Sequence, residues 1–348
     1  MKRILTSFWL IVALLAMGVN AFAAEEVSDS TQVTKPEAEF DMMHTITGHI
    51  SDSHSWPIFE YKNAEGKEVA IKLPLPVIAY HKGDWIFTLS SSFDERATYE
   101  HNGYSYSIDD DKDKLVAADG ESVFDISITR NVASMFMSAA LLLLLFVGAA
   151  RSYKRSEVPH GRTSLVEMLV LFVKDIADDQ IGKAKSAKYT PYLLTIFYFI
   201  WINNLIGLVP FFPFGTNLSG NIAFTSTLAI ITFLITNVNA SKHYWKHNLT
   251  VPGVPFILKF IMVPIEIMSM FTKPFTLLIR LFANVTGGHI IIISLISMIF
   301  MMKSYAMAVP SVLLALFVSG LELILGALQA YIFTVLSALY IGLAIEEE

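Results

Sequence analysis

The stretch from Pro264 to Phe300 is apolar enough to lie in a lipid bilayer, yet it carries an arginine, Arg280, in its middle. A central arginine costs about 2.5–3.5 kcal/mol on insertion scales, and it keeps its proton because its pKa lies above about 12. The alternative is an arginine that snorkels to a lipid headgroup, but the nearest chain break, at Lys273 and Pro274, lies nearly two helical turns away. The stretch therefore predicts a membrane helix that uses a permanent positive charge.

The composition of the chain is that of a polytopic membrane protein. Of its 348 residues, 54% are hydrophobic and 16% are charged, whereas soluble domains carry about 25% charged residues. The net charge of -6 offers no basic surplus for nucleic acid. The chain has no cysteine, which excludes disulfides, thiolate catalysis and cysteine-ligated metal sites.

Residues 1–24 have the pattern of a secretory signal peptide. Lys2 and Arg3 form a charged start, residues 8–17 an apolar core, and residues 21–23 a small-residue cleavage pattern. A retained first helix is the alternative, although the apolar run is short for a membrane span. The following residues are therefore expected outside the cytoplasm.

Residues 25–128 are expected to form a small β-rich extracytoplasmic domain with a polar, disordered start. Short alternating runs, such as Val69–Ile71 and Trp85–Phe87, are separated by glycine, proline and aspartate, which is typical of strands joined by turns. Asp109–Asp113 is expected to be an acidic turn, because it lacks the glycine and the terminal glutamate of an EF-hand.

Three histidines in this region, His44, His49 and His54, are spaced five residues apart. Such spacing fits neither one face of a helix nor one face of a strand. A metal site is the alternative interpretation, and solvated loop histidines are favoured over it. We expect neither a metal ion nor a cofactor in the chain.

The first membrane span is expected at Val132–Ala150, which carries no charge. The basic cluster Arg151–Arg155 follows it and indicates the cytoplasmic side, in agreement with an exported N-terminal domain. In residues 163–188, apolar side chains recur at helical spacing with charged ones between them. This pattern predicts an amphipathic helix at the cytoplasmic interface.

Two further spans are expected at Pro191–Val209 and Ile222–Val238. The loop 211–220 between them has no lysine or arginine and is expected outside the cytoplasm. Lys242 and Lys246 follow the third span and indicate the cytoplasmic side again.

Two long apolar segments, 260–302 and 310–345, complete an all-α membrane domain at 129–348. A helix of about 35 residues is about 52 Å long, whereas the hydrocarbon core is about 30 Å thick. Each segment is therefore either two spans or one strongly tilted helix. No turn signal divides the last segment, so we expect two long, inclined helices and about five transmembrane helices in all.

Polar side chains on these two segments indicate a proton pathway. Asn284 follows Arg280 by four residues on the same helix face, and His289 follows by nine on the opposite side. Glu322 and Gln329 belong to one polar stripe of the last segment, with Ser319 and Gly326. Glutamate and histidine can pass protons near neutral pH, whereas an arginine can only block them.

Four runs of the sequence resemble subunit a of the F-type ATP synthase, over roughly residues 130–348. These runs are KPFTLLIRLFANVTGGH at 273–289, LQAYIFTVLSALYIGLAIEEE at 328–348, NNLIGLVP at 203–210 and PIEIMSMFTKP at 264–274. The resemblance implies a proton-translocating stator subunit that lies against a ring of c subunits and forms two aqueous half-channels. It also implies a b-subunit peripheral stalk as partner, no nucleotide site in this chain, and a bacterial inner-membrane location with a cytoplasmic C-terminus.

The resemblance assigns roles to particular residues. Arg280 matches the arginine that separates the half-channels, with Asn284 and Gln329 beside it. His289 and Glu322 match a polar pair that stands in exchanged order in some members. Supporting polar positions are Asn204, Glu266, Ser269 and Lys273, whereas Gly207 stands where some members have aspartate.

Two other functional classes compete with this interpretation. A stand-alone secondary transporter usually shows an internal repeat, and none is visible in the sequence. An intramembrane hydrolase is disfavoured because the chain has no HExxH motif and no nucleophile-elbow pattern.

Overall fold

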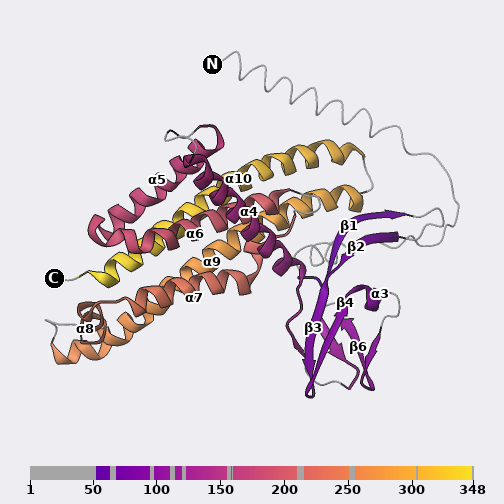
Figure 1. The fold of residues 1–348 in the computed structure, drawn as a ribbon, viewed down its shortest axis with the longest axis horizontal. Coiled ribbons are helices and arrows are strands. Elements are labelled where there is room, and N and C mark those ends of the chain that lie inside the picture. The colour runs from indigo at the N-terminus through magenta and orange to yellow at the C-terminus, as the bar shows by residue number, and fades with distance from the viewer. Residues whose placement is uncertain are drawn as a thin grey trace, which may run out of the picture. The chain divides into compact units, whose positions relative to one another are not determined.

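The computed structural model shows a helical membrane part preceded by β-strands (Figure 1). It describes residues 52–62, 68–94, 98–109, 114–119, 123–154, 158, 160–209, 215–250, 255–302 and 305–346. The expected signal peptide, the polar start of the N-terminal domain, and His44 and His49 lie outside these residues.

The described N-terminal strands form three antiparallel sheets, ordered β1-β2, β4-β3-β8 and β5-β6-β7. Their bounds are β1 Ser55–Lys62, β2 Glu68–Pro74, β3 Pro76–His81, β4 Asp84–Leu89, β5 Tyr99–His101, β6 Tyr104–Asp109, β7 Lys114–Ala117 and β8 Phe124–Asp125, with a short helix α3 at Ser91–Asp94. The prediction of β structure ahead of the membrane helices is confirmed. Asp109 pairs with Lys114 across the expected acidic turn, whose residues 110–113 lie outside the described chain.

The core of the β structure lies between two of these sheets. Val77, Ala79 and Ile86 of β3 and β4 pack with Tyr106 and Leu115 of β6 and β7. Alternate residues of a strand point to opposite faces, so the other face of each sheet is left outside this core. The spacing of buried residues along β3 follows this period of two.

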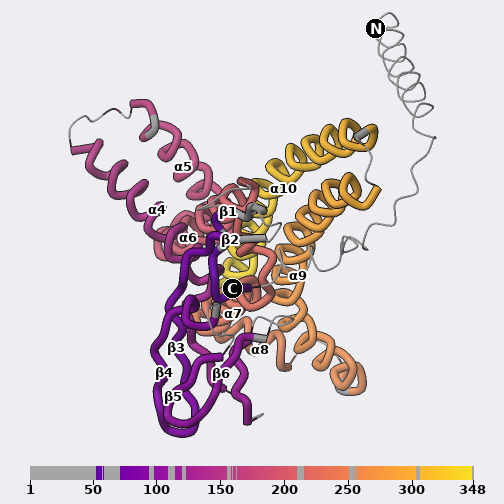
Figure 2. Tube along the Cα trace, turned by 90° about the vertical axis from the view of Figure 1, so that its right-hand side faces the viewer, coloured from indigo at the N-terminus to yellow at the C-terminus, as the bar shows by residue number. Residues whose placement is uncertain are grey.

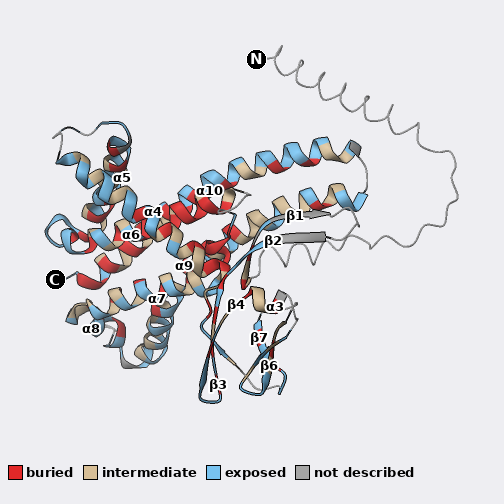
Figure 3. Cartoon of the chain, turned by 45° about the vertical axis from the view of Figure 1, so that its right-hand side comes forward, coloured by how far each residue is buried: buried red, intermediate tan, exposed pale blue. Residues whose placement is uncertain are grey.

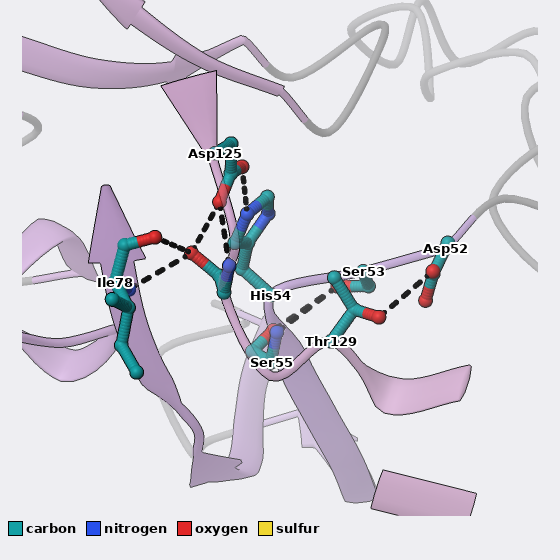
Figure 4. Close-up of polar contacts among 8 residues, drawn as sticks. Asp52, Ser53, His54, Ser55, Ile78, Asp125 and Thr129 are labelled. Atoms are coloured by element: carbon teal, nitrogen blue, oxygen red, sulfur yellow. Dashed lines mark hydrogen bonds and ion pairs between the residues drawn. The ribbon is translucent and has the colours of Figure 1, made fainter. Parts of the chain in front are cut away.

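The start of the first membrane helix, α4 at Arg130–Tyr153, is capped by a residue that precedes β1. The Asp52 carboxylate accepts a hydrogen bond from the Thr129 hydroxyl at 2.8 Å (Figure 4). It also accepts a hydrogen bond from the Asn131 backbone N–H at 3.1 Å. The Arg130 N–H donates to the Ser53 carbonyl at 2.8 Å. A carboxylate satisfies the free N–H groups of a helix start and interacts favourably with the helix dipole. The β structure is thus fastened to the start of α4.

A second polar contact holds β8 beside this junction. His54 Nε2 lies 2.8 Å from an Asp125 carboxylate oxygen, and the Ser127 N–H donates to the other oxygen at 2.9 Å (Figure 4). Partial burial raises the pKa of Asp125, but the hydrogen bonds from His54 and Ser127 outweigh it, so this pKa lies below its ordinary value. His54 is 3% exposed and hydrogen-bonds Asp125 of β8, so the expectation of a solvated loop histidine was wrong for His54. Among the described residues, no group of three histidine, aspartate or glutamate side chains could hold a metal ion.

Seven further helical elements follow α4. Their bounds are α5 Arg162–Ile181, α6 Lys183–Leu208, the 3-10 turn η1 Leu218–Gly220, α7 Ile222–Val238, α8 Lys242–Thr250, α9 Phe256–Met302 and α10 Tyr305–Ile345. By length and composition, four described helices could cross a membrane: α4, α6, α9 and α10. The number becomes five if α7 and α8, bent by 102°, count as one span. The chain is a multi-pass membrane protein.

One expected boundary was wrong. The amphipathic helix expected at 163–188 ends at Ile181, because Gly182 adopts a positive φ of 88° that breaks the helix. The next helix begins at Lys183, eight residues before the expected start, and contains Pro191 within it. A proline is tolerated there at the loss of one backbone hydrogen bond.

Each of the two long apolar segments forms one helix, of 47 residues in α9 and 41 in α10. These lengths correspond to about 70 Å and about 62 Å, more than twice the thickness of a hydrocarbon core. The strong inclination expected for these helices stays a prediction. The described residues divide into two compact units, one containing Gly288–Gly320 and the larger containing Ile50–Gly287 and Leu321–Glu348.

Within the larger unit, α6 is the central helix of the apolar core. The helices α4 and α5 pack on it (Figure 2), and residues of α9 and α10, such as Leu281 and Phe333, join the same core. Buried residues gather on α6 and on the C-terminal half of α10 (Figure 3).

The C-terminal end of α10 is held by three other elements. Lys185 Nζ, at the start of α6, donates to the Ile345 carbonyl at 2.9 Å, and the Ser241 N–H, before α8, donates to the Ala344 carbonyl at 2.8 Å. A lysine at this end also complements the helix dipole. Gly342 packs so closely on the end of α5 that a Cβ there would overlap the Gln180 carbonyl oxygen. These contacts fix how α10 is rotated about its own axis.

We predict that Gly342→Ala destabilises the protein by about 1–3 kcal/mol, because the added methyl group overpacks the contact with α5. Gly320→Ala in the same helix is the control, because a Cβ there meets no atom within 4 Å. Both substitutions gain the same helix propensity, so the difference in melting temperature of the solubilised chain reports the overlap. Equal melting temperatures of the Gly342→Ala and Gly320→Ala variants would contradict the close contact of Gly342 with α5.

We predict that acid weakens the β structure through Asp125. Its lowered pKa provides stability above the ordinary aspartate value of about 4, and that stability is lost as the pH falls through the lowered pKa. The protection factors of β3 amides in the full chain, which are exchange rates corrected for the intrinsic rate at each pH, should fall on acidification more in the wild type than in Asp125→Asn. The same change in both proteins would argue against this role.

Candidate functional site

An amide pair joins the two long helices. Asn284 Nδ2 on α9 donates to Gln329 Oε1 on α10 at 3.0 Å. Gln329 is 2% exposed. The resemblance implied that both residues lie near Arg280, and it did not pair them with each other. The structure therefore brings these two predicted residues together.

The predicted polar stripe of α10 lies on the buried side of the helix. Glu322 is 7% exposed, and Gly326 and Gln329 follow it on the same buried face. The neighbouring leucines at 321, 325 and 328 are exposed, so the helix presents an apolar side outward. A buried carboxyl group is costly when charged, which is typical of a group that exchanges a proton.

Asn204 of α6 reaches the same stripe. Its Nδ2 donates to the Gly326 carbonyl at 3.2 Å, and a Cβ at Gly326 would lie 3.0 Å from the Asn204 Cβ. A glycine is therefore needed for this close approach between α6 and α10. Asn204, predicted as a supporting position, is placed beside Glu322 and Gln329 along the helix.

The structure adds a polar cluster around η1 that the sequence did not single out. Asn217 Oδ1 accepts the Gly220 N–H at 2.8 Å, and the Thr286 hydroxyl of α9 donates to the Gly220 carbonyl at 3.4 Å. Thr216 and Ser219 beside them are 1% exposed. The charge-free polar run at 216–221 between two spans was the available signal.

Several buried polar atoms of this region find no partner among the described residues. They are Asn203 Oδ1, Asn204 Oδ1, Thr216 Oγ1, Asn217 Nδ2, Ser219 Oγ and Gln329 Nε2. A buried polar atom without a hydrogen bond is costly, and ordered water normally satisfies such groups. The arrangement favours a hydrated region that extends from η1 to α10.

Arg280 lies outside this cluster. It is exposed, and within the described ranges its guanidinium has no hydrogen bond or ion pair. Leu277 and Leu281 on either side of it are buried in the core, so the charged group projects from the flank of α9. Asn284 lies one turn further along the same flank, as predicted.

His289 belongs to the unit that contains Gly288–Gly320, whereas Glu322 belongs to the larger unit. His289 is partly buried. The predicted pairing of these two side chains stays a prediction.

The remaining predicted positions lie towards the N-terminal end of α9. Lys273 Nζ is 5.7 Å from the centre of the Tyr340 ring of α10, a cation–π contact. A narrow cavity of about 10 Å³ is lined by Lys273, Tyr340, Thr236 and Asn237, among others. Glu266 and Ser269 are partly buried but lie about 21 Å and 16 Å along the helix from Arg280, so they are not part of its surroundings.

Comparison with known proteins covers both parts of the chain. Residues 132–342 match the family model of the ATP synthase A chain, and residues 45–135 match a domain of unknown function (DUF8433). The second match spans the β structure and the start of α4.

Curated relatives agree with the first match. The chain is 47% identical to ATP synthase subunit a of Chloroherpeton thalassium over 233 residues, which is 65% of this chain and 68% of the relative. It is also 47% identical to ATP synthase subunit a 2 of Prosthecochloris aestuarii, over 65% of this chain and 71% of that protein. Subunit a of an Anaeromyxobacter species is 41% identical over 63% of this chain and 54% of its own length. The chain therefore belongs to the ATP synthase A chain family.

Proposed function

We propose that this chain is the proton-translocating stator subunit of a rotary F-type ATP synthase, with no catalytic site of its own. It lies against a ring of c subunits, is held by a b-subunit peripheral stalk, and couples proton flow to rotation. The observation that carries this proposal is Arg280, an exposed cation in the middle of a membrane helix, which has no hydrogen bond or ion pair among the described residues.

The charge on Arg280 needs a counter-charge from another molecule. A carboxylate at 4 Å would gain about 4 kcal/mol at an effective dielectric constant of about 20. Each carboxylate of a rotating ring can meet Arg280 in turn, lose its proton there and move on. Because the guanidinium does not release its proton, it also separates the two half-channels and prevents a direct leak.

The hydrated polar region beside η1 supports the first half-channel. Its amides and hydroxyls, on Asn204, Asn217 and Ser219, can hold a chain of water molecules, and they lead towards the buried Glu322. The loop that contains η1 has no lysine or arginine, which favours the extracytoplasmic side. In this proposal, as the resemblance implies, Glu322 and His289 supply an acid and an imidazole to the proton path.

The narrow cavity at Lys273 and Tyr340 supports the second half-channel, on the opposite side of Arg280. Its side chains include the hydroxyl of Thr236 and the amide of Asn237, which can bind water. Glu266 and Ser269 line the exit further along α9. In this proposal the exit lies near Lys242 and the C-terminus, which we assign to the cytoplasm of a bacterial cell, with residues 25–128 outside the inner membrane.

We predict that Arg280→Ala abolishes ATP-driven proton pumping in inverted membrane vesicles, because the fixed charge is both the contact with the ring and the barrier to leakage. Assembly of the complex is measured in the same vesicles. Arg151→Ala, which removes an exposed cation at the end of α4, is the control and should pump normally. An assembled Arg280→Ala complex that still pumps would reopen the interpretation as a transporter.

We predict that exchanging His289 and Glu322 together impairs pumping less than changing either residue to alanine. The exchange keeps one acid and one imidazole in the path, whereas each alanine variant removes one of them. Initial pumping rates of the three variants, corrected for the amount of assembled complex, test this. If the exchange is as damaging as the single changes, the two residues do not act as a pair.

A further inference from the structure

The sheet β4-β3-β8 has one face in the core of the β structure and a second face made of apolar residues. The strand register and the backbone hydrogen bonds place these residues in three rows, which are Trp85, Tyr80 and Phe124, then Phe87, Ile78 and Ile126, then Leu89, Pro76 and Ile128. We call these nine residues the aromatic face. The strands β3 and β4 that carry most of it lie side by side (Figure 1).

The aromatic face is open and carries no charge. Phe87 is 68% exposed, Phe124 65% and Trp85 50%. The Tyr80 and Trp85 rings are 5.2 Å apart, and the Trp85 and Phe87 rings are 6.2 Å apart, so the aromatic groups form a continuous surface. A continuous apolar surface of this kind is uncommon on a soluble domain and marks contact with a membrane or another molecule.

The aromatic face continues directly into the first membrane helix. Ile128, in its last row, precedes Arg130, the first residue of α4, by two positions. The hydrogen bonds of Asp52 with Thr129 and Asn131 hold the segment that connects the sheet to the start of α4. A helix of 24 residues is about 36 Å long, just longer than a hydrocarbon core of about 30 Å. The last row therefore lies at the level where α4 enters the bilayer.

We propose that the aromatic face docks on the outer surface of the lipid bilayer around α4. Tryptophan and tyrosine are enriched at this interface, because their rings are apolar and their N–H and O–H groups reach water or headgroups. Phe87 and Phe124 reach the boundary of the acyl chains. The central strand β3 is paired with a neighbouring strand on each side, so docking through this face requires mainly side chains to leave the water.

The distribution of charge agrees with a neutral, zwitterionic lipid surface as the occupant. The nine residues include no lysine or arginine that would favour an anionic headgroup. The acidic residues of this sheet, Asp84 on β4 and Asp125 on β8, alternate with the aromatic residues and therefore belong to its other face. Glu100 on β5 and Asp119 after β7 lie outside this sheet. The docked sheet would stabilise the position of the start of α4. Because α4 packs against the central helix α6, it would also stabilise the position of α6.

The chain has no cysteine, so a single introduced cysteine can be labelled with an environment-sensitive fluorophore. Phe87→Cys reports the aromatic face, and Val116→Cys on β7, which is 38% exposed outside that face, is the matched control. The full chain is studied in phosphatidylcholine nanodiscs, in which both sides are accessible. We expect the label at 87 to show blue-shifted emission and several-fold stronger quenching by nitroxide-labelled phosphatidylcholine than the label at 116. We expect aqueous iodide to quench in the opposite order.

Equal access of iodide to both labels, with no effect of the nitroxide lipid, would overturn the proposal. A label at 87 that is shielded from iodide and from the nitroxide lipid, in nanodiscs or in the assembled complex, would also overturn it, in favour of a protein partner. If Phe87→Cys does not fold, native Trp85 fluorescence in brominated phosphatidylcholine, measured as the difference between wild type and Trp85→Phe, gives the same answer. These measurements are independent of proton transport and of the function proposed for the membrane part.

Discussion

A permanent charge in a low-dielectric medium must be neutralised by something, and Arg280 is not neutralised within the described chain. Arg280 lies on an exposed side of α9 and not in a closed core. Its neighbours Leu277 and Leu281 pack inward, whereas Arg280 itself and Asn284 remain on the flank of α9. In our proposal the missing charge comes from the c ring and is renewed at each step of rotation. The subunit is then electrostatically complete only in the complex.

The second constraint is the rotation of α10 about its axis. Three features oppose any turn of this helix: the amide contact of Asn204 with Gly326, the pair of Asn284 and Gln329, and the contacts of its C-terminal end. A helix that rotated by one residue, about 100°, would carry Glu322 out of the buried stripe. The absence of a Cβ at Gly326 and Gly342 therefore matters to the site as its polar groups do, since it permits the close packing that orients those groups.

Hydropathy predicted the helices α4, α9 and α10 well, because a long apolar run has few other ways to fold, whereas α7 is long enough to span a membrane only together with α8. The helical spacing of polar residues predicted the stripe of Glu322 and Gln329, because both residues lie on one helix and on one face of it. The break at Gly182 was missed because Pro191 offered a stronger helix-start signal nearby, and the structure instead keeps the proline inside α6. The cluster at η1 was missed for a different reason: Gly220 meets Thr286, 66 positions away, and sequence periodicity does not report such contacts. The sheet pairing of the N-terminal strands, and hence the aromatic face, is non-local in the same way.

The cap of α4 has a consequence for biogenesis. Asp52 and Asn131 are separated by 79 positions, and every described strand lies between them. The helix start obtains its acceptor only after those strands have folded and brought the two ends together. The start of the first membrane helix is therefore coupled to the folding of the preceding domain: a chain whose β structure misfolds leaves the N–H groups at the start of α4 without this acceptor.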